Sequence, residues 1–179
     1  MKSLRPLLII LAIIALIVTL FLTLAQKENM VTVFKGNIAK QPIPLTLNHY
    51  QDSACGMVID EFDYASQVIA PDGTTWFFHD HGGMVKWLED RSFKDKAVIW
   101  VYARDSKKWI DAHKAFYTRD EETPMLYGFG AYEKPAKDRI SFDEMKQYTL
   151  RGETMENPRI RQQLLAKKGK ETKEIDGNH

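Results

Sequence analysis

One uninterrupted apolar run dominates the N-terminal end of the chain. From Leu7 to Leu24 the sequence has eighteen residues without a charge, and Lys2 and Arg5 precede them. At about 1.5 Å per helical residue the run reaches roughly 27 Å, close to the bilayer hydrocarbon thickness of about 30 Å. A cleaved signal peptide has a shorter apolar core, of about 7–15 residues, so residues 1–25 are predicted to be an uncleaved transmembrane anchor.

This anchor predicts a location for the rest of the chain. Lys2 and Arg5 favour a cytoplasmic N-terminus, which gives a single-pass protein of the inner membrane with residues 26–179 in the periplasm or another extracytoplasmic space. Without these two residues, 23 basic side chains stand against 24 acidic ones. A balance near −1 gives no reason to expect a nucleic-acid partner.

Periodicity and turn residues predict a mixed α+β domain after the anchor. Branched and aromatic runs flank Pro71-Asp72-Gly73, which is typical of a tight hairpin. We expect a linker over 26–50, a domain over 51–150, and a C-terminal helix with a disordered tail over 151–179. The expected strands are 64–70, 74–78, 97–103, 109–110, 115–117 and 126–132, and the expected helices follow Asp80, Ser141 and Asn157.

The chain has a single cysteine, Cys55. In an oxidising compartment a lone thiol cannot form an internal disulfide, so it must be buried, capped or bound to a metal. Met57 stands two positions on, and on an extended segment both side chains project from one face, with no side chain on Gly56 between them. Thiolate and thioether sulfur are ligands that Cu(I) favours.

Other residues are candidate ligands or permit other functions. Met84 and Met125 are further possible thioether donors, and His79 with His81 could complete a Cys-His-His zinc site. Met84 also suits a helix core, and paired histidines at a strand end are often solvated. A cysteine nucleophile with a histidine base remains open, although common hydrolase, phosphate-binding and redox motifs are missing.

Short motifs in a fixed order resemble the NosL-type copper-binding accessory proteins of nitrous oxide reductase maturation, over roughly residues 53 to 133. The matching pieces are Cys55-Gly-Met-Val-Ile59, Ala65-Ser-Gln67 before Asp72-Gly73, Phe78-His-Asp80 leading into Gly83-Met84, Ile99-Trp-Val101, Trp109-Ile-Asp-Ala112, and Thr123-Pro-Met125 before Tyr127-Gly128.

The resemblance implies a fold and a set of ligands. The fold would be two related ββαβ halves, shared with the organomercurial lyases. Cys55 and Met57 match the copper motif of the family, and Met125 matches its Pro-Met position as a third ligand. This chain departs from the family in using a helical anchor where members are commonly lipoproteins. It also has His79-Asp80 where the family usually has two aspartates.

These features together predict a membrane-anchored, extracytoplasmic Cu(I) chaperone rather than an enzyme. The resemblance implies delivery to nitrous oxide reductase, beside a copper-maturation transporter or periplasmic partner. Cys55, Met57 and Met125 are the expected ligands, with Met84, His79 and His81 as further candidates. The alternatives are a membrane-tethered interaction module with a buried structural cysteine, and a zinc or organomercurial-lyase-like enzyme.

Overall fold

The computed structural model describes residues 5–24 and 30–176. Within this part the chain folds into a mixed α+β domain, as the sequence predicts. A five-stranded sheet has the order β1-β3-β2-β4-β5, and every neighbouring pair is antiparallel. These strands are β1 (Val33–Phe34), β2 (Ser66–Ile69), β3 (Thr75–Phe78), β4 (Val98–Ala103) and β5 (Lys108–Asp111). A second sheet pairs β6 (Phe116–Tyr117) with β7 (Ala131–Tyr132).

The predicted hairpin joins β2 to β3. The Asp72 carboxylate accepts hydrogen bonds from the Thr74 backbone N–H and hydroxyl, and Gly73 adopts a φ of +82°. Gly73 is suited to this backbone because a side chain there would be strained. The register places Val68 opposite both Trp76 on β3 and Ile99 on β4, which makes β2 the central strand.

Both faces of β2 are buried, and different parts of the chain cover them. One face carries Val68 into the main core beneath α2 (His81–Glu89) and α3 (Phe142–Leu150). On the other face a smaller core of Ile59, Ala65 and Phe77 is covered by Val31, Ile43, Leu45 and Tyr50. Gln67 fixes this cover, since its side-chain amide donates to the Ile43 carbonyl and accepts from the Ile43 N–H at 2.8 Å each. The described part of the predicted linker is therefore packed against the sheet.

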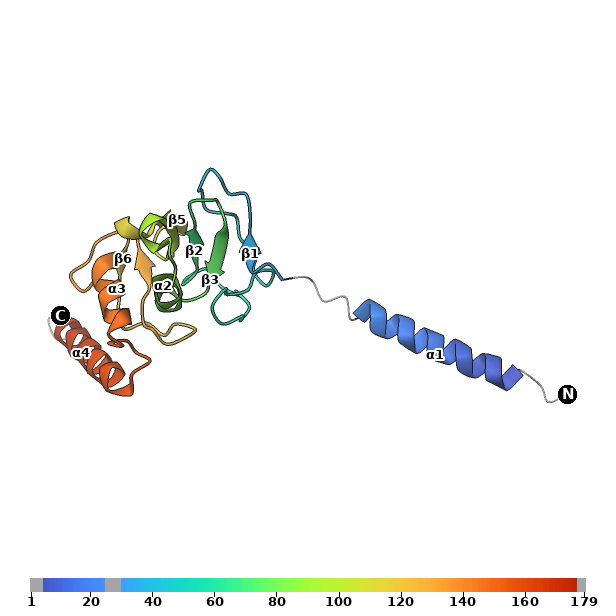
Figure 1. The fold of residues 1–179 in the computed structure, drawn as a ribbon. Coiled ribbons are helices and arrows are strands. Elements are labelled where there is room, and N and C mark those ends of the chain that lie inside the picture. Colours follow the sequence, from blue (N-terminus) through green and yellow to red (C-terminus); the bar gives the residue numbers. More distant parts are fainter. Residues whose placement is uncertain (1–4, 25–29, 177–179) are drawn as a thin grey trace.

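The helix starts predicted after Asp80, Ser141 and Asn157 are all confirmed. Asp80 caps α2 by accepting the Gly82 N–H, and Ser141 with Glu144 forms a complete capping box at α3. Figure 1 shows α2 between the sheet and α3, with α4 (Pro158–Asp176) on the outer side of α3. Two short 3₁₀ turns, η1 (Lys94–Lys96) and η2 (Ala112–Lys114), complete the domain.

Of the two predicted ββαβ halves, the first is confirmed and the second is wrong. The first unit is present as β2-β3-α2-β4. The second runs β6-β7-α3, and in the described residues beyond α3 the chain continues into α4 instead of a strand. Residues 151–157 and α4 have no run of alternating branched or aromatic residues with which to form one.

The predicted transmembrane anchor, and with it the single-pass membrane location, is wrong. Residues 5–24 do form a helix, α1 (Arg5–Leu24), and its large apolar side chains that the structure describes, from Leu8 to Leu22, are exposed. In the described part of the chain, no helix combines the length and the apolar character that crossing a membrane requires.

Candidate metal centre

Cys55 lies in a tight loop between residues 52 and 57. The Asp52 N–H donates to the Met57 carbonyl and the Gly56 N–H donates to the Asp52 carbonyl, both at 2.8 Å. Gly56 has a φ of +76°, which a residue with a side chain rarely adopts. The loop is therefore closed on itself, and its backbone holds Cys55 at an exposed position.

The neighbouring Ser53 attaches this loop to the end of β3. Its N–H donates to the Phe77 carbonyl at 2.8 Å, and its hydroxyl accepts from the Phe77 N–H while donating to the Thr32 carbonyl. The chain leaves β3 at Phe78, and His79 follows directly before the cap of α2. The loop and His79 are thus brought together at the point where β3 ends and α2 begins.

The buried carboxylate of Asp52 organises the site. One oxygen accepts the N–H groups of Ala54 and Cys55, at 2.7 and 3.0 Å. The other accepts the His79 N–H at 3.0 Å and lies 2.6 Å from His79 Nδ1. Burial alone would raise the pKa of Asp52, but the hydrogen bonds from His79, Cys55 and Ala54 bring it below the ordinary value. Asp52 is therefore ionised at neutral pH and saturated with donors.

His79 is buried with one ring nitrogen unused. Its exposed fraction is 2%, and Nε2 has no hydrogen-bond partner among the described residues. If Nδ1 carries the proton that bonds to Asp52, Nε2 keeps its lone pair. A carboxylate that fixes the imidazole through one nitrogen and leaves the other for a metal is a common arrangement in metalloproteins.

Asp52, Cys55 and His79 form a group that could hold a metal ion. One donor atom from each residue lies within 4.8 Å of the other two. Asp52 and His79 are buried and Cys55 is exposed, so the group spans the boundary between the domain interior and solvent. A thiolate, an imidazole and a carboxylate are ligands for several metals, so the set does not select one.

Cys55 is protonated at neutral pH. Burial raises the pKa of its thiol above the ordinary value, the Met57 N–H lowers it, and the nearby Asp52 carboxylate raises it again. The thiol is consequently a poor nucleophile in the metal-free protein, because the thiolate is the reactive form. A metal would have to displace the proton, as it does at other cysteine sites.

The predicted thioether ligands lie in different surroundings. Met57 follows Cys55 in the same loop and is 50% exposed, so its side chain is free to turn. Met125 lies on a different loop, where its N–H donates to the Asp80 carboxylate. Its sulfur is 3.3 Å from the position that a Cβ on Gly83 would take, so Met125 packs against the first turn of α2.

Met84 and His81 lie outside the group. Met84 is fully buried in the main core. His81 is also fully buried, with Nδ1 2.7 Å from the Ser66 hydroxyl and its ring edge against Tyr117. Burial, with a smaller effect of Arg104, lowers the pKa of His81 to about 3. The structure therefore separates the two histidines that stand only two positions apart.

The sequence reasoning assigned no role to Asp52, although a signal was available. Asp, Asn and Ser side chains often accept backbone N–H groups two or three residues ahead, and Asp52 stands three positions before the cysteine. Its pairing with His79 spans 27 positions and has no local signature.

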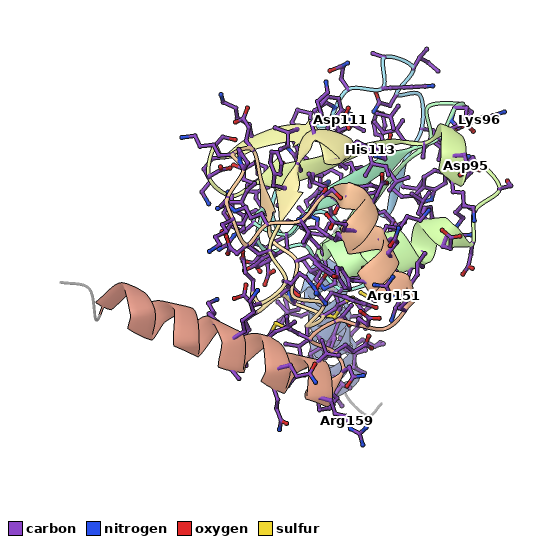
Figure 2. The ribbon with its side chains drawn as sticks, turned by 90° about the vertical axis from the view of Figure 1, so that its left-hand side faces the viewer. Asp95, Lys96, Asp111, His113, Arg151 and Arg159 are labelled. Carbon is purple, nitrogen blue, oxygen red and sulfur yellow. The ribbon has the colours of Figure 1, made fainter. Side chains whose placement is uncertain are left out.

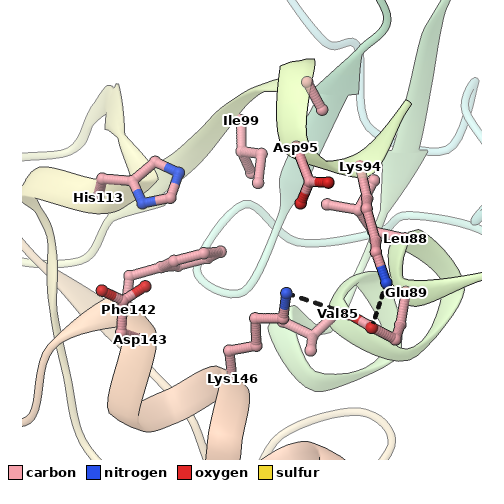
Figure 3. A pocket seen from close by; sticks show the side chains of 11 residues that line it. Val85, Leu88, Glu89, Lys94, Asp95, Ile99, His113, Phe142, Asp143 and Lys146 are labelled. Atoms are coloured by element: carbon pink, nitrogen blue, oxygen red, sulfur yellow. Dashed lines mark hydrogen bonds and ion pairs between the residues drawn. The ribbon is translucent and has the colours of Figure 1, made fainter. Parts of the chain in front are cut away.

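A second hollow lies elsewhere, between α2, α3 and η1. Its volume is about 290 Å³, and apolar side chains form part of its lining. Figure 3 shows His113, Asp143 and Lys146 around it. The Glu89 carboxylate is bridged by Lys94 and Lys146, so its charge is already compensated. No cysteine lines this cavity, and none of the three residues of the metal group does.

The chain matches no protein-family model, and no curated protein matches its sequence. The resemblance to the NosL-type proteins thus rests on the short motifs alone and remains a hypothesis. What the structure adds independently is the arrangement of Asp52, Cys55 and His79.

Proposed function

We propose that the protein is a Cu(I) carrier that binds its ion through the Cys55 thiolate and His79, and passes it to a recipient by ligand exchange. The observation that carries this proposal is the meeting of an exposed thiol with a buried imidazole that has an unused nitrogen. The copper motif that the sequence resembles supports the choice of metal.

The hydrogen bonds divide the three residues into two roles. The carboxylate of Asp52 already accepts three N–H groups and lies against His79 Nδ1, so it positions the loop and the imidazole. That leaves the Cys55 sulfur and His79 Nε2 as donors. A soft thiolate with an imidazole suits Cu(I), which has little use for a carboxylate.

Met57 is the third ligand in this proposal. It is joined to Cys55 through Gly56, whose backbone turns the loop, and its exposed side chain can reach an ion held at the surface. An exposed ion with few ligands lets the donors of a recipient attack before the original bonds break. Release then needs no unfolding of the domain.

No bond of a substrate is broken in this scheme, so the protein is not proposed to be an enzyme. The recipient that the motif resemblance implies is nitrous oxide reductase, together with its copper-maturation partners. The ion itself is the cargo, and the fold supplies only its binding and its accessibility.

A zinc site is the second candidate, and one observation favours it. Asp52 and His79 give the group an oxygen and a nitrogen donor beside the thiolate, and Zn(II) accepts all three. This reading requires Asp52 to give up hydrogen bonds to the loop or to His79 in order to bind the ion.

A competition titration against a chromophoric Cu(I) chelator, repeated with a Zn(II) chelator, tests the proposal on the full chain. We expect one Cu(I) per chain, at least a hundredfold weaker binding in Cys55→Ser and at least tenfold in His79→Gln, since each 1.4 kcal/mol is a factor of ten. Met57→Leu should cause a smaller loss. His113→Gln is the matched control, because His113 lines the separate hollow, and it should bind as the wild type does.

The variants also separate the two metals. Unchanged Cu(I) affinity in Cys55→Ser would contradict the copper proposal. If the same variant lost tight Zn(II) binding while Cu(I) binding stayed weak and unaffected, the zinc site would replace it.

A further inference from the structure

A large open cavity lies beside the loop that holds Cys55. Its volume is about 500 Å³, and its walls come from the loop, from β3 and from the end of α2. The loop contributes Asp52, Ser53 and Gly56 to its lining, and three aromatic residues, Trp76, Trp87 and Phe93, line it too. Cavities of about 300–1,000 Å³ are the usual size for small-molecule sites.

Three aromatic rings form one wall. The rings of Trp76 and Phe93 are stacked, with centroids 5.2 Å apart and planes at 13°, and Trp87 packs against Trp76 at 5.1 Å. All three are only partly buried, although they pack on the main core. Because the three side chains are only partly buried, they keep exposed apolar surface on which a planar apolar group can pack.

The positive charge of this cavity belongs to Arg91. Its guanidinium lies over the Trp87 ring, 4.1 Å from the centroid. Its Nε is buried, and among the described residues it has no hydrogen-bond partner and Arg91 forms no ion pair with a carboxylate. Buried donors are normally satisfied, so an unpaired one in a cavity wall indicates a missing acceptor.

The only acidic residue in the wall does not supply that acceptor. The Asp52 carboxylate is fully buried and is held by His79 and by the loop N–H groups. A guanidinium fixed flat on an indole presents its remaining N–H groups in a fork that matches a carboxylate.

We propose that this cavity binds a small organic anion with a flat apolar body, of the arylcarboxylate class. The carboxylate pairs with Arg91, and the body stacks on Trp76 and Phe93. This site does not depend on the metal proposal, because none of these three residues belongs to the metal group. A ligand seated here lies next to Gly56 and therefore beside Cys55.

Titration of the full chain with phenylacetate, and in parallel with the neutral phenylacetamide, tests the proposal. The indole N–H signals of Trp76 and Trp87 should shift and saturate in NMR spectra. The signal of Trp100, whose N–H is bonded to the Lys40 carbonyl, should stay unchanged as an internal control. We expect phenylacetate to bind at least tenfold more tightly than phenylacetamide, as a charge-assisted pair predicts.

Two arginine variants complete the test. Arg91→Gln should weaken phenylacetate at least tenfold and leave phenylacetamide within about twofold, since only the charged pair is removed. Arg151→Gln is the matched control. Arg151 lies at the end of α3 (Figure 2), pairs with Glu153 and does not line the cavity, so this variant should change neither affinity. Equal affinity of the wild type for the two probes, or no saturable shift at millimolar phenylacetate, would overturn the proposal.

Discussion

A single residue, Asp52, connects the parts of the candidate metal centre. Its carboxylate fixes the loop that carries Cys55 and orients the imidazole of His79. The sequence indicated the thiol and its adjacent thioether because they are neighbours along the chain. It could not indicate the carboxylate–imidazole pair, since that pair depends on how β3 delivers His79 to the loop.

Asp52→Asn should weaken Cu(I) binding by about 10–100-fold, the usual loss when the group that orients a metal-binding histidine is removed. The amide also turns an NH₂ group toward backbone N–H donors, so we expect a loss of about 1–3 kcal/mol in the free energy of unfolding. Chelator competition and urea unfolding measure the two effects. Asp138→Asn, at an exposed position, should show neither, and wild-type affinity in Asp52→Asn would remove Asp52 from the site.

His81 should make the domain less stable in acid. Its folded pKa is about 3, against an unfolded value near 6.5, so between these pH values the unfolded chain binds the extra proton. Stability therefore falls as the pH drops from about 6.5 toward 3, by at most about 1.4 kcal/mol per pH unit from this residue.

The comparison with His81→Gln isolates this effect in urea unfolding at a series of pH values. The variant lacks the titrating ring, so its disadvantage relative to the wild type should shrink as the pH falls below about 6.5. A difference that stays constant down to about pH 4 would show that His81 is protonated without penalty in the folded protein.

At the scale of elements, the sequence predicted the helices and the turn that interactions between nearby residues stabilise. Asp80 as a cap, followed by Met84, Val85 and Leu88 at helical spacing, predicted α2. The capping box of Ser141 and Glu144 predicted α3. The Pro71-Asp-Gly73 turn gave the β2–β3 hairpin. The bounds of the two-residue strand β6 were harder to predict, because its pairing with β7 depends on the intervening loop and not on its own sequence.

The first turn of α2 should not tolerate a side chain at Gly82. A Cβ there would lie 2.2 Å from Cγ of Tyr127, a contact that real structures do not show. We expect Gly82→Ala to lower the free energy of unfolding by about 1–3 kcal/mol. Gly169→Ala, within α4 and with nothing within 4 Å, is the matched control and should raise it by up to about 1 kcal/mol. Equal effects in thermal unfolding would contradict the close packing of α2 against Tyr127.

At the scale of the whole molecule, long-range packing decided what the sequence analysis missed. Residues 26–50 were predicted to be a linker because they lack sustained periodicity. Four of them, Val31, Ile43, Leu45 and Tyr50, nevertheless pack on the second face of the sheet, where Gln67 bonds to Ile43. The prediction of a second ββαβ half was also wrong, because after α3 the chain continues into α4. A resemblance in short motifs carries no information about such segments.

Binding of the ion should stabilise the domain as a whole. A ligand that binds only the folded state at a hundred times its dissociation constant adds about 2.7 kcal/mol. Thermal unfolding with Cu(I) buffered at that level should show this gain in the wild type, and a strong Cu(I) chelator should reverse it. Cys55→Ser should show no gain, and a stabilisation equal to that of the wild type would place the ion elsewhere.

X-ray absorption at the copper edge of the Cu(I)-loaded full chain tests the central claim most directly. We expect sulfur and nitrogen in the first coordination sphere of the copper ion. Nitrogen should be lost in His79→Gln, and the amount of sulfur should fall in Cys55→Ser. A sphere of oxygen and nitrogen without sulfur, or one unchanged in both variants, would contradict it.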